Sequence, residues 1–227
     1  MDLNKAGRGD AGTAELSSPL NLVGAGTLKP ASPGFIGPCI PTSARRPPTD
    51  GAWLHELKIE GYRFQIIKAD QQVRLFSRSG LEWTDRHSGL AAAFLRLRCR
   101  SALLDGQLVP PDSNCDLGLN PLLWTAGEEP EFVFFAFDLL HWDDDDLRSL
   151  PLAERRQHLV RLVSLSEISR LHLVQIFNDG DRLLAEAERM ELQGIVSKRW
   201  AAPYKSGNSR DWIKVKTNAW RETNKLR

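Results

Sequence analysis

The sequence predicts an α+β fold in which antiparallel sheets are covered by helices on the outside. Three observations lead to this prediction. β-Rich segments separated by short polar turns fill residues 53–77, an almost continuous apolar run spans 132–140, and amphipathic helical patterns span 151–163 and 179–190. The 227 residues suffice for one large domain or two small ones, and no internal repeat is present.

The two ends of the chain differ from its middle. Residues 1–33 are rich in Gly, Ala, Ser and Pro without periodicity, which predicts a disordered leader. Residues 34–217 are expected to form the folded domain, whose proline-punctuated beginning should run extended over the surface. Residues 218–227 form a basic C-terminal tail.

The first half of the domain is dominated by strands. Segments 54–59, 62–69 and 73–77 are expected to pair as an antiparallel meander. Thr84 or Asp85 can cap a helix that runs to about residue 98. Segment 102–109 is a strand in which Gly106 suggests close approach by a ligand, and segment 132–140 suggests a strand buried on both faces.

The second half contains two predicted helices and three strands. The Ser-Leu-Pro at 149–151 should start a helix that turns Leu152, Leu159 and Leu162 inward and Arg155 and Arg156 outward. A strand over 171–176, a helix over 179–190, and strands over 194–199 and 212–216 complete the domain.

Composition restricts the class of protein. No stretch of about eighteen apolar residues and no signal-peptide pattern exist, which predicts a cytoplasmic protein without a membrane partner. The three cysteines show no paired motif and are expected to be reduced thiols. Net charge is +1, yet the C-terminal thirty or so residues are basic, which permits a phosphate-rich partner or simply a solvated tail.

The stretch 56–63, Glu-Leu-Lys-Ile-Glu-Gly-Tyr-Arg, places a lysine inside an apolar strand pattern. Alternation puts Glu56, Lys58 and Glu60 on one face. A lysine becomes a nucleophile only when burial or nearby cations lower its pKa. Lys214 and Lys216 share one face of the last strand and could supply such charge, although each alone could be a solvated edge residue.

Six short segments in order resemble the motifs of ATP-dependent polynucleotide ligases. They are 56–63 (motif I), Ser-Arg-Ser-Gly at 77–80, Asp-Gly-Gln at 105–107, Phe-Phe-Ala-Phe-Asp at 134–138 (motif III), Gln-Gly-Ile-Val-Ser-Lys at 193–198 (motif IV) and Asp-Trp-Ile-Lys-Val-Lys at 211–216 (motif V). The order and gaps are most similar to the adenylation modules of bacterial end-joining DNA ligases. The resemblance implies an ATP-grasp-like nucleotidyltransferase core of antiparallel sheets with flanking helices.

The resemblance also implies a role for each matching residue. Lys58 would attack the α-phosphorus of ATP and hold AMP, while Lys214 and Lys216 would neutralise the phosphate during catalysis. The implied ATP-binding set is Glu56, Lys58, Arg63, Arg78, Phe137, Lys198, Lys214 and Lys216, with Glu56 reading the adenine amino group and Phe137 stacking on the base. Mg²⁺ or Mn²⁺ would bridge phosphate oxygens.

Three positions depart from the family pattern, and they include the expected metal-binding positions. Glu60 replaces an aspartate, and Gln107 and Gln193 replace glutamates. Mg²⁺ prefers anionic oxygen, so these metal positions are degenerate. The family also continues into an OB-fold domain, which the remaining eleven or so residues are too few to form. We therefore expect a separate OB-fold or end-joining protein to supply it.

The expected function is that of an ATP-dependent DNA ligase acting on nicked or broken DNA in repair or recombination. Two alternatives stay open: a catalytically degenerate module that binds nucleotide or DNA ends, and an RNA ligase or capping-type nucleotidyltransferase. Structural readings also compete at single residues. Phe137 could be core packing, Arg78 a turn residue and Asp138 a buried structural acid, while Asp143–Asp146 reads as a solvated acidic turn and the histidines show no metal-ligand spacing.

Overall fold

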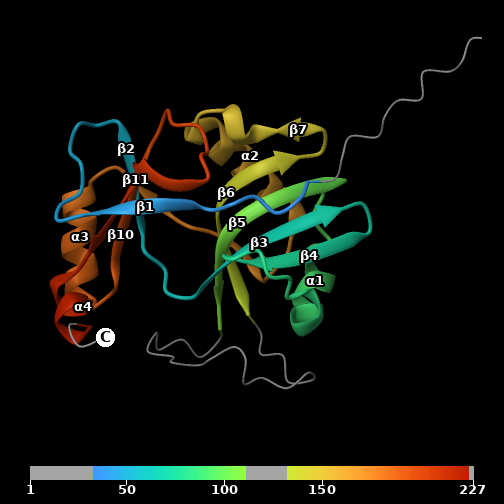
Figure 1. Ribbon diagram of the computed structural model, residues 1–227, viewed down its shortest axis with the longest axis horizontal. Coiled ribbons are helices and arrows are strands. Elements are labelled where there is room, and N and C mark those ends of the chain that lie inside the picture. Colours follow the sequence, from blue (N-terminus) through green and yellow to red (C-terminus); the bar gives the residue numbers. More distant parts are fainter. Residues whose placement is uncertain (1–32, 111–131, 225–227) are drawn as a thin grey trace, which may run out of the picture. The chain divides into compact units, whose positions relative to one another are not determined.

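The computed structural model describes residues 33–110 and 132–224, which form two sheets with four helices (Figure 1). The predicted leader, apart from Pro33, and Cys115 lie outside the described residues. The prediction of an α+β fold is confirmed. Cys39 and Cys99, the two cysteines within the described ranges, are free thiols.

The five-stranded sheet has the order β1-β11-β10-β2-β9. Its strands are β1 (Cys39–Ala44), β2 (Trp53–Leu57), β9 (Ile176–Phe177), β10 (Gly194–Arg199) and β11 (Gly207–Lys216). Pairing is antiparallel except between β1 and β11, which run parallel. Helix α3 (Gly180–Arg189) packs on one face of this sheet, and the short α4 (Asn218–Thr223) follows β11 (Figure 1).

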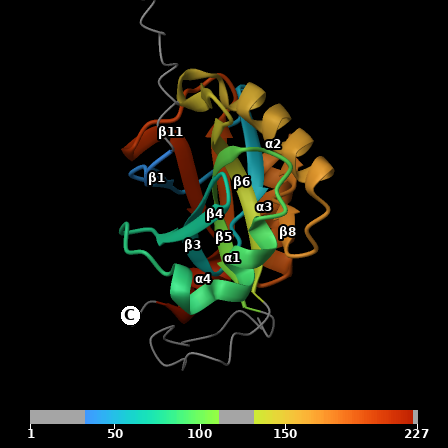
Figure 2. The same cartoon turned by 90° about the vertical axis from the view of Figure 1, so that its right-hand side faces the viewer.

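The six-stranded sheet has the order β4-β3-β5-β6-β7, and β8 pairs with β6 in parallel. Its strands are β3 (Tyr62–Ala69), β4 (Gln72–Ser77), β5 (Ser101–Val109), β6 (Val133–Trp142), β7 (Asp145–Asp146) and β8 (Leu171–Leu173). Helices α1 (Ser88–Phe94) and α2 (Leu152–Ser166) pack against it, with α2 running beside β6 (Figure 2). These helices and one face of the sheet enclose the largest apolar core.

Several predicted elements need correction. Segments 54–59 and 62–77 do not form one meander, because β2 belongs to one sheet while β3 and β4 pair in the other. The predicted strand 171–176 is likewise two strands, β8 and β9, in different sheets. Strand order depends on long-range pairing, which local alternation does not encode.

Other corrections concern element ends and buried side chains. The helix predicted to reach residue 98 ends at Phe94, and it is preceded by a 3₁₀ turn over Thr84–His87 without a side-chain cap. Within the segment that was predicted to run extended, residues Cys39–Ala44 form strand β1, which pairs with β11. Arg155 and Arg156, predicted to point outward, are buried, because each finds a buried carboxylate partner. The acidic segment that begins at Asp143 forms the predicted exposed turn, with Asp143 at a left-handed φ of 53°.

Candidate active site

A cavity of about 630 Å³ lies between the two sheets. The five-stranded sheet contributes Val196, Lys198, Trp212 and Lys214 to its lining. The six-stranded sheet and the turn after β4 contribute Arg63, Gln107, Phe137 and Arg78, and Lys58 lines it from the loop after β2. The structure therefore brings residues of all six sequence segments together at this cavity, although the predicted site residues Glu56, Glu60, Gln193 and Lys216 are not part of its lining.

Strand register explains how the charged residues of the five-stranded sheet share a face. Val196 pairs directly with Glu56 on one side and with Lys214 on the other, so the three lie in one row across the sheet. Lys198 pairs with Trp212 two residues along. The opposite face carries Ile195, Ile213 and Val215, which pack under α3. The predicted alternation of β11 is confirmed.

Lys58 lies just beyond the end of β2, not within a strand as predicted. Its backbone N–H donates to the Gly194 carbonyl at 2.9 Å, which fixes the loop to the sheet. Burial is the largest cause that lowers the pKa of the Lys58 amine, to about 8, and the charges of Lys216, Lys214 and Arg78 lower it further, while Glu60 opposes them. At pH 7.5 roughly a quarter of such an amine is neutral, against about 0.1% at the ordinary lysine pKa.

Glu56 and Lys198 form a buried ion pair beneath the cavity. The Lys198 Nζ lies 2.6 Å from Glu56 Oε2, and both side chains are at most 3% exposed. The same ammonium lies 4.2 Å from the centre of the Phe137 ring and 4.3 Å from that of Trp212. Lys198 is thus fixed by one carboxylate and two aromatic faces, which also orients Phe137 at the cavity wall.

Arg63 is held by protein groups. Its guanidinium donates to both carboxylate oxygens of Asp105 at 3.0 and 2.6 Å and to the Cys39 carbonyl at 2.5 Å. Tyr204 completes the cluster, because its hydroxyl donates to Asp105 at 2.8 Å. The remaining face of the guanidinium lies 5.2 Å from the centre of the Phe137 ring. These contacts leave Arg63 at the cavity wall with its hydrogen-bonding edge occupied.

Lys216 does not line the cavity. Its ammonium lies 3.0 Å from the centre of the Trp220 ring on α4, a cation–π contact. Helix α4 is itself fixed by Glu188, whose carboxylate accepts from the backbone N–H groups of Asn218 and Ala219 at 2.7 and 2.8 Å. Lys216 therefore acts on Lys58 through its charge from beside the cavity.

The three predicted metal-binding positions are not brought together on the cavity wall. Only Gln107 lines it, and its amide Nε2 donates to the carbonyls of Ile59 and Gly61 at 3.3 and 3.2 Å. Gln193 lies outside the lining, and its Oε1 is buried without a hydrogen-bond partner among the described residues. Within the same ranges, no group of three His, Cys, Asp or Glu is arranged to hold a metal ion.

Sequence reasoning missed several residues of the site. Four residues that were given no role support the predicted ones. Asp105 and Trp212 lie within the motif segments 105–107 and 211–216, whereas Tyr204 and Arg156 carry no local pattern that distinguishes them from core or surface. Gly106, expected to mark a ligand, instead packs under Phe134, since an added Cβ would lie 2.4 Å from that ring. Asp138 is confirmed as a buried structural acid, paired with Arg155.

Two sheets that enclose a cavity, lined by a lysine of lowered pKa and by further cations, are the arrangement of the nucleotidyltransferase class. Residues 44–216 match the family model of the ATP-dependent DNA ligase domain. The chain therefore belongs to the ATP-dependent DNA ligase family, as the six motifs predicted. This match favours a DNA ligase over the RNA ligase or capping alternative.

Two curated relatives and two solved structures illustrate the relationship. The multifunctional non-homologous end joining protein LigD of Pseudomonas aeruginosa is 34% identical over 191 residues, which cover 83% of this chain and 23% of LigD. A probable DNA ligase of Streptomyces avermitilis is 32% identical over 180 residues, which cover 73% of this chain and 35% of that ligase. The chain thus spans about a quarter to a third of the length of these relatives.

The ligase domain of M. tuberculosis LigD aligns with a TM-score of 0.67 and 26% identity over 79% of this chain and 59% of that one. The ATP complex of the bacteriophage T7 ligase aligns with a TM-score of 0.61 over 79% of this chain and 68% of that one, and at 16% identity it supports the fold alone. In the part of the chain described, no helix combines the length and apolarity needed to cross a membrane.

Proposed function

We propose that this domain forms a covalent lysine–AMP from ATP and passes the AMP to a DNA 5′-phosphate, which prepares a nick or break for sealing. One observation carries the proposal: the Lys58 amine, with a pKa near 8, lines a cavity beside Lys214 and Arg78. A neutral amine next to fixed cations is what attack on a phosphoryl group requires.

The reaction would proceed by two displacements. The neutral Lys58 Nζ forms a bond to the α-phosphorus, the bond from that phosphorus to the bridging oxygen breaks, and pyrophosphate leaves with that electron pair. The amine proton is lost to solvent. A DNA 5′-phosphate oxygen then displaces Lys58 and takes over the AMP. Lys214 would stabilise the charge that gathers on the phosphate oxygens, with Lys216 adding its field from beside the cavity.

The base end of the cavity would be formed by Glu56, Phe137 and Lys198. The Phe137 ring lines the cavity and would stack on adenine, while the charges of Lys198 and Arg63 lie over the same ring. Glu56 Oε1 is buried and without a hydrogen-bond partner among the described residues, so it is a free acceptor for the adenine amino group. Arg63 would contribute positive charge to the wall while it stays bound to Asp105, and Arg78, which is exposed, would reach the phosphates.

The described residues do not fit a resident divalent metal. Gln107 turns its amide nitrogen toward backbone carbonyls, and Gln193 lies off the cavity wall. In the proposed scheme Mg²⁺ or Mn²⁺ enters as the counterion of ATP, and Gln107, Gln193 and Glu60 remain predicted positions near it.

We also propose that the domain acts on DNA in the cytoplasm and works with a separate OB-fold or end-joining protein. The relative named LigD is described as a non-homologous end joining protein. We propose domain boundaries at residues 34 and 217, which enclose the matched range 44–216. The second candidate function is a degenerate module that binds nucleotide or DNA ends. It is favoured by the neutral Gln107 and Gln193, since loss of a positioned charge typically costs about 10²–10³ in rate.

The experiment incubates the protein with α-labelled ATP and Mg²⁺ or Mn²⁺ and measures the covalent, acid-labile AMP adduct. The expected result is an adduct in wild type that Lys58→Ala abolishes and the exposed control Lys205→Ala retains. An adduct that survives Lys58→Ala contradicts the assignment of the nucleophile. No adduct in wild type, but one in Gln193→Glu, supports the degenerate module instead.

A further inference from the structure

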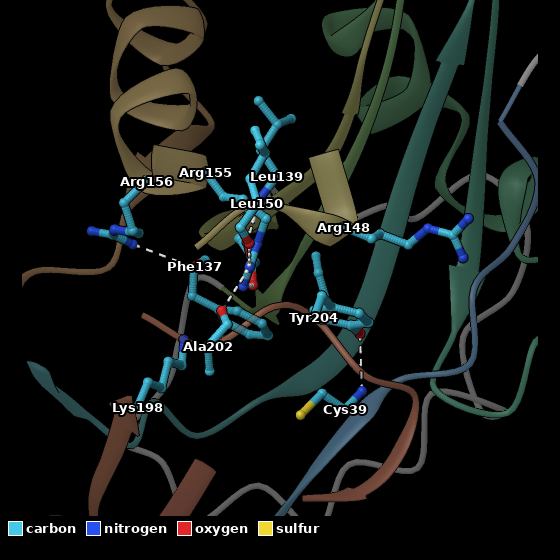
Figure 3. Close-up of polar contacts among 12 residues, drawn as sticks. Cys39, Phe137, Leu139, Arg148, Leu150, Arg155, Arg156, Lys198, Ala202 and Tyr204 are labelled. Atoms are coloured by element: carbon cyan, nitrogen blue, oxygen red, sulfur yellow. Dashed lines mark hydrogen bonds and ion pairs between the residues drawn. The ribbon is translucent and has the colours of Figure 1, made fainter. Parts of the chain in front are cut away.

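Arg156 on α2, which helical spacing placed outward, is buried. It is 6% exposed, and its guanidinium reaches three separate segments. Its Nη2 donates to the Val174 carbonyl at 2.7 Å, and its Nη1 donates to the Phe137 carbonyl at 3.3 Å. Its Nη1 also lies 3.6 Å from Glu56 Oε1. Figure 3 shows the side chain directed from α2 toward Phe137.

The three segments that Arg156 joins meet at the same end of the cavity. Phe137 and Val174 line it, and Glu56 lies beneath it, paired with the cavity-lining Lys198. These segments come from β2, β6 and the connection between β8 and β9, so they belong to both sheets. One guanidinium therefore fixes the relative positions of an aromatic ring, a backbone wall and a carboxylate.

We propose that Arg156 is a specificity-determining positioning residue, which holds the Glu56 carboxylate relative to the Phe137 ring and makes the site prefer adenine to guanine. The inference rests on the proposed function, in which Glu56 reads the base. Arg156 touches neither the nucleotide nor the phosphates and acts through Glu56.

The charges around Glu56 support this role. Lys198 engages Oε2 at 2.6 Å, whereas Arg156 approaches Oε1 at 3.6 Å, which is too far for a hydrogen bond. Arg156 therefore places a positive charge near the carboxylate but leaves an acceptor site on Oε1 open. The amino group at C6 of adenine can donate to that oxygen. Guanine carries a carbonyl oxygen there, which the carboxylate repels.

The chemistry of arginine suits the position. A planar guanidinium can donate to two carbonyls while its charge faces a carboxylate, which the single ammonium of lysine cannot reproduce. If the Arg156 guanidinium is removed, the Phe137 and Val174 carbonyls lose their buried hydrogen-bond donors and Glu56 loses one of its two cationic neighbours. The carboxylate is then free to turn fully toward Lys198, and the discrimination between the two bases falls.

The test measures equilibrium binding of ATP and of GTP by calorimetry for wild type, Arg156→Met and Arg156→Lys. We expect Arg156→Met to weaken ATP binding by about tenfold or more and to change GTP binding little, so the ATP/GTP affinity ratio falls. Arg156→Lys should recover part of the ratio because it restores the charge.

Two variants on the same helix serve as controls. Arg161→Met changes an exposed arginine that packs over Trp142, and it should leave both affinities unchanged. Arg155→Lys damages a buried arginine that does not contact Glu56. It should lower the melting temperature, and because a loss of folded protein lowers both affinities in proportion, the ratio should stay constant.

The outcomes separate this inference from the proposed function. A lower melting temperature in Arg156→Met with an unchanged ATP/GTP ratio overturns the role in specificity, and so does a wild type that binds both nucleotides equally. A fallen ratio supports it even if wild type forms no AMP adduct, in which case the proposed function fails alone. If wild type forms the AMP adduct but Arg156→Met leaves the ATP/GTP ratio unchanged, the proposed function stands and the role of Arg156 in specificity fails.

Discussion

The two sheets differ in what they bury. The six-stranded sheet and helices α1 and α2 enclose the main apolar core, and the arginine that it presents to the cavity, Arg63, is bound by Asp105. The five-stranded sheet has a small apolar cluster under α3 and adds Cys39 and Trp212 to a second cluster that it shares with the six-stranded sheet. Its cavity-facing side also carries Glu56, Lys198 and Lys214. Apolar burial thus stabilises mainly the six-stranded sheet, and most of the lysines near the cavity are placed on the five-stranded one.

The contrast is explained by the cost of burying charge. Charged groups lose hydration when they leave water, and partners must offset that loss. A buried ion pair does so, because Arg155 donates to both oxygens of Asp138 at 2.8 Å. Arg155 also donates to the carbonyls of Leu150 and Ala202 (Figure 3). Ala202 lies in the loop that connects motif IV to motif V. Arg155 therefore links the five-stranded sheet, which carries these motifs, to Asp138 in the six-stranded sheet.

The largest expected effect tests that link. Arg155→Met should lower the free energy of unfolding by about 3–5 kcal/mol, because it leaves the Asp138 carboxylate buried without its partner. The measurement is urea denaturation. The matched control is Arg148→Met, which breaks the exposed pair with Asp146 and should cost no more than about 1 kcal/mol. Equal losses in the two variants would contradict the distinction.

The next expected effect concerns the charges of Lys216 and Glu60, which shift the pKa of Lys58. The neutral amine reacts, so the adenylation rate should rise about tenfold per pH unit below pH 8 and level off above it. Lys216→Ala removes a charge that lowers the pKa of Lys58, so the curve should move to higher pH. Glu60→Gln removes a charge that raises that pKa, so the curve should move to lower pH.

Single-turnover adduct formation from about pH 6 to 10 provides the measurement. Lys205→Ala, which alters an exposed lysine outside the cavity lining, is the control and should leave the midpoint in place. Shifts of Lys216→Ala and Glu60→Gln in the same direction would show that the two charges do not act on Lys58 as the geometry requires.

The smallest expected effect is a change in adenylation rate on substitution of Gln107 in the six-stranded sheet. Gln107→Glu restores the carboxylate of the family motif, yet it should slow adenylation by a few-fold, since a carboxylate cannot donate to the carbonyls of Ile59 and Gly61. Those carbonyls belong to the loop after Lys58. Rates of Gln107→Glu are compared with those of the exposed Gln72→Glu. A faster Gln107→Glu enzyme would indicate that the lost charge outweighs the lost hydrogen bonds.

Particular residues show how far the sequence leads. The bounds of β3 and β10 and the helix over 180–189 follow closely from alternation and helical spacing, because these patterns are local. The motif order placed Lys58, Lys198 and Lys214 near one site, and all three line the cavity. By contrast, the prediction that Arg155 and Arg156 point outward was wrong. Helical periodicity cannot show that carboxylates from other strands, Asp138 and Glu56, lie under the helix and pair with these arginines.

The sequence by itself determined the family, the kinds of element and the residues that supply charge, because these depend on residue type and short spacing. Only the tertiary structure decided which sheet each strand joins and which cations face Lys58. It also decided that Gln107 binds backbone and that Arg156 lies against Glu56. Each of these depends on contacts between residues far apart in the chain, such as Arg156 and Glu56, which meet only when α2 packs over the junction of the two sheets.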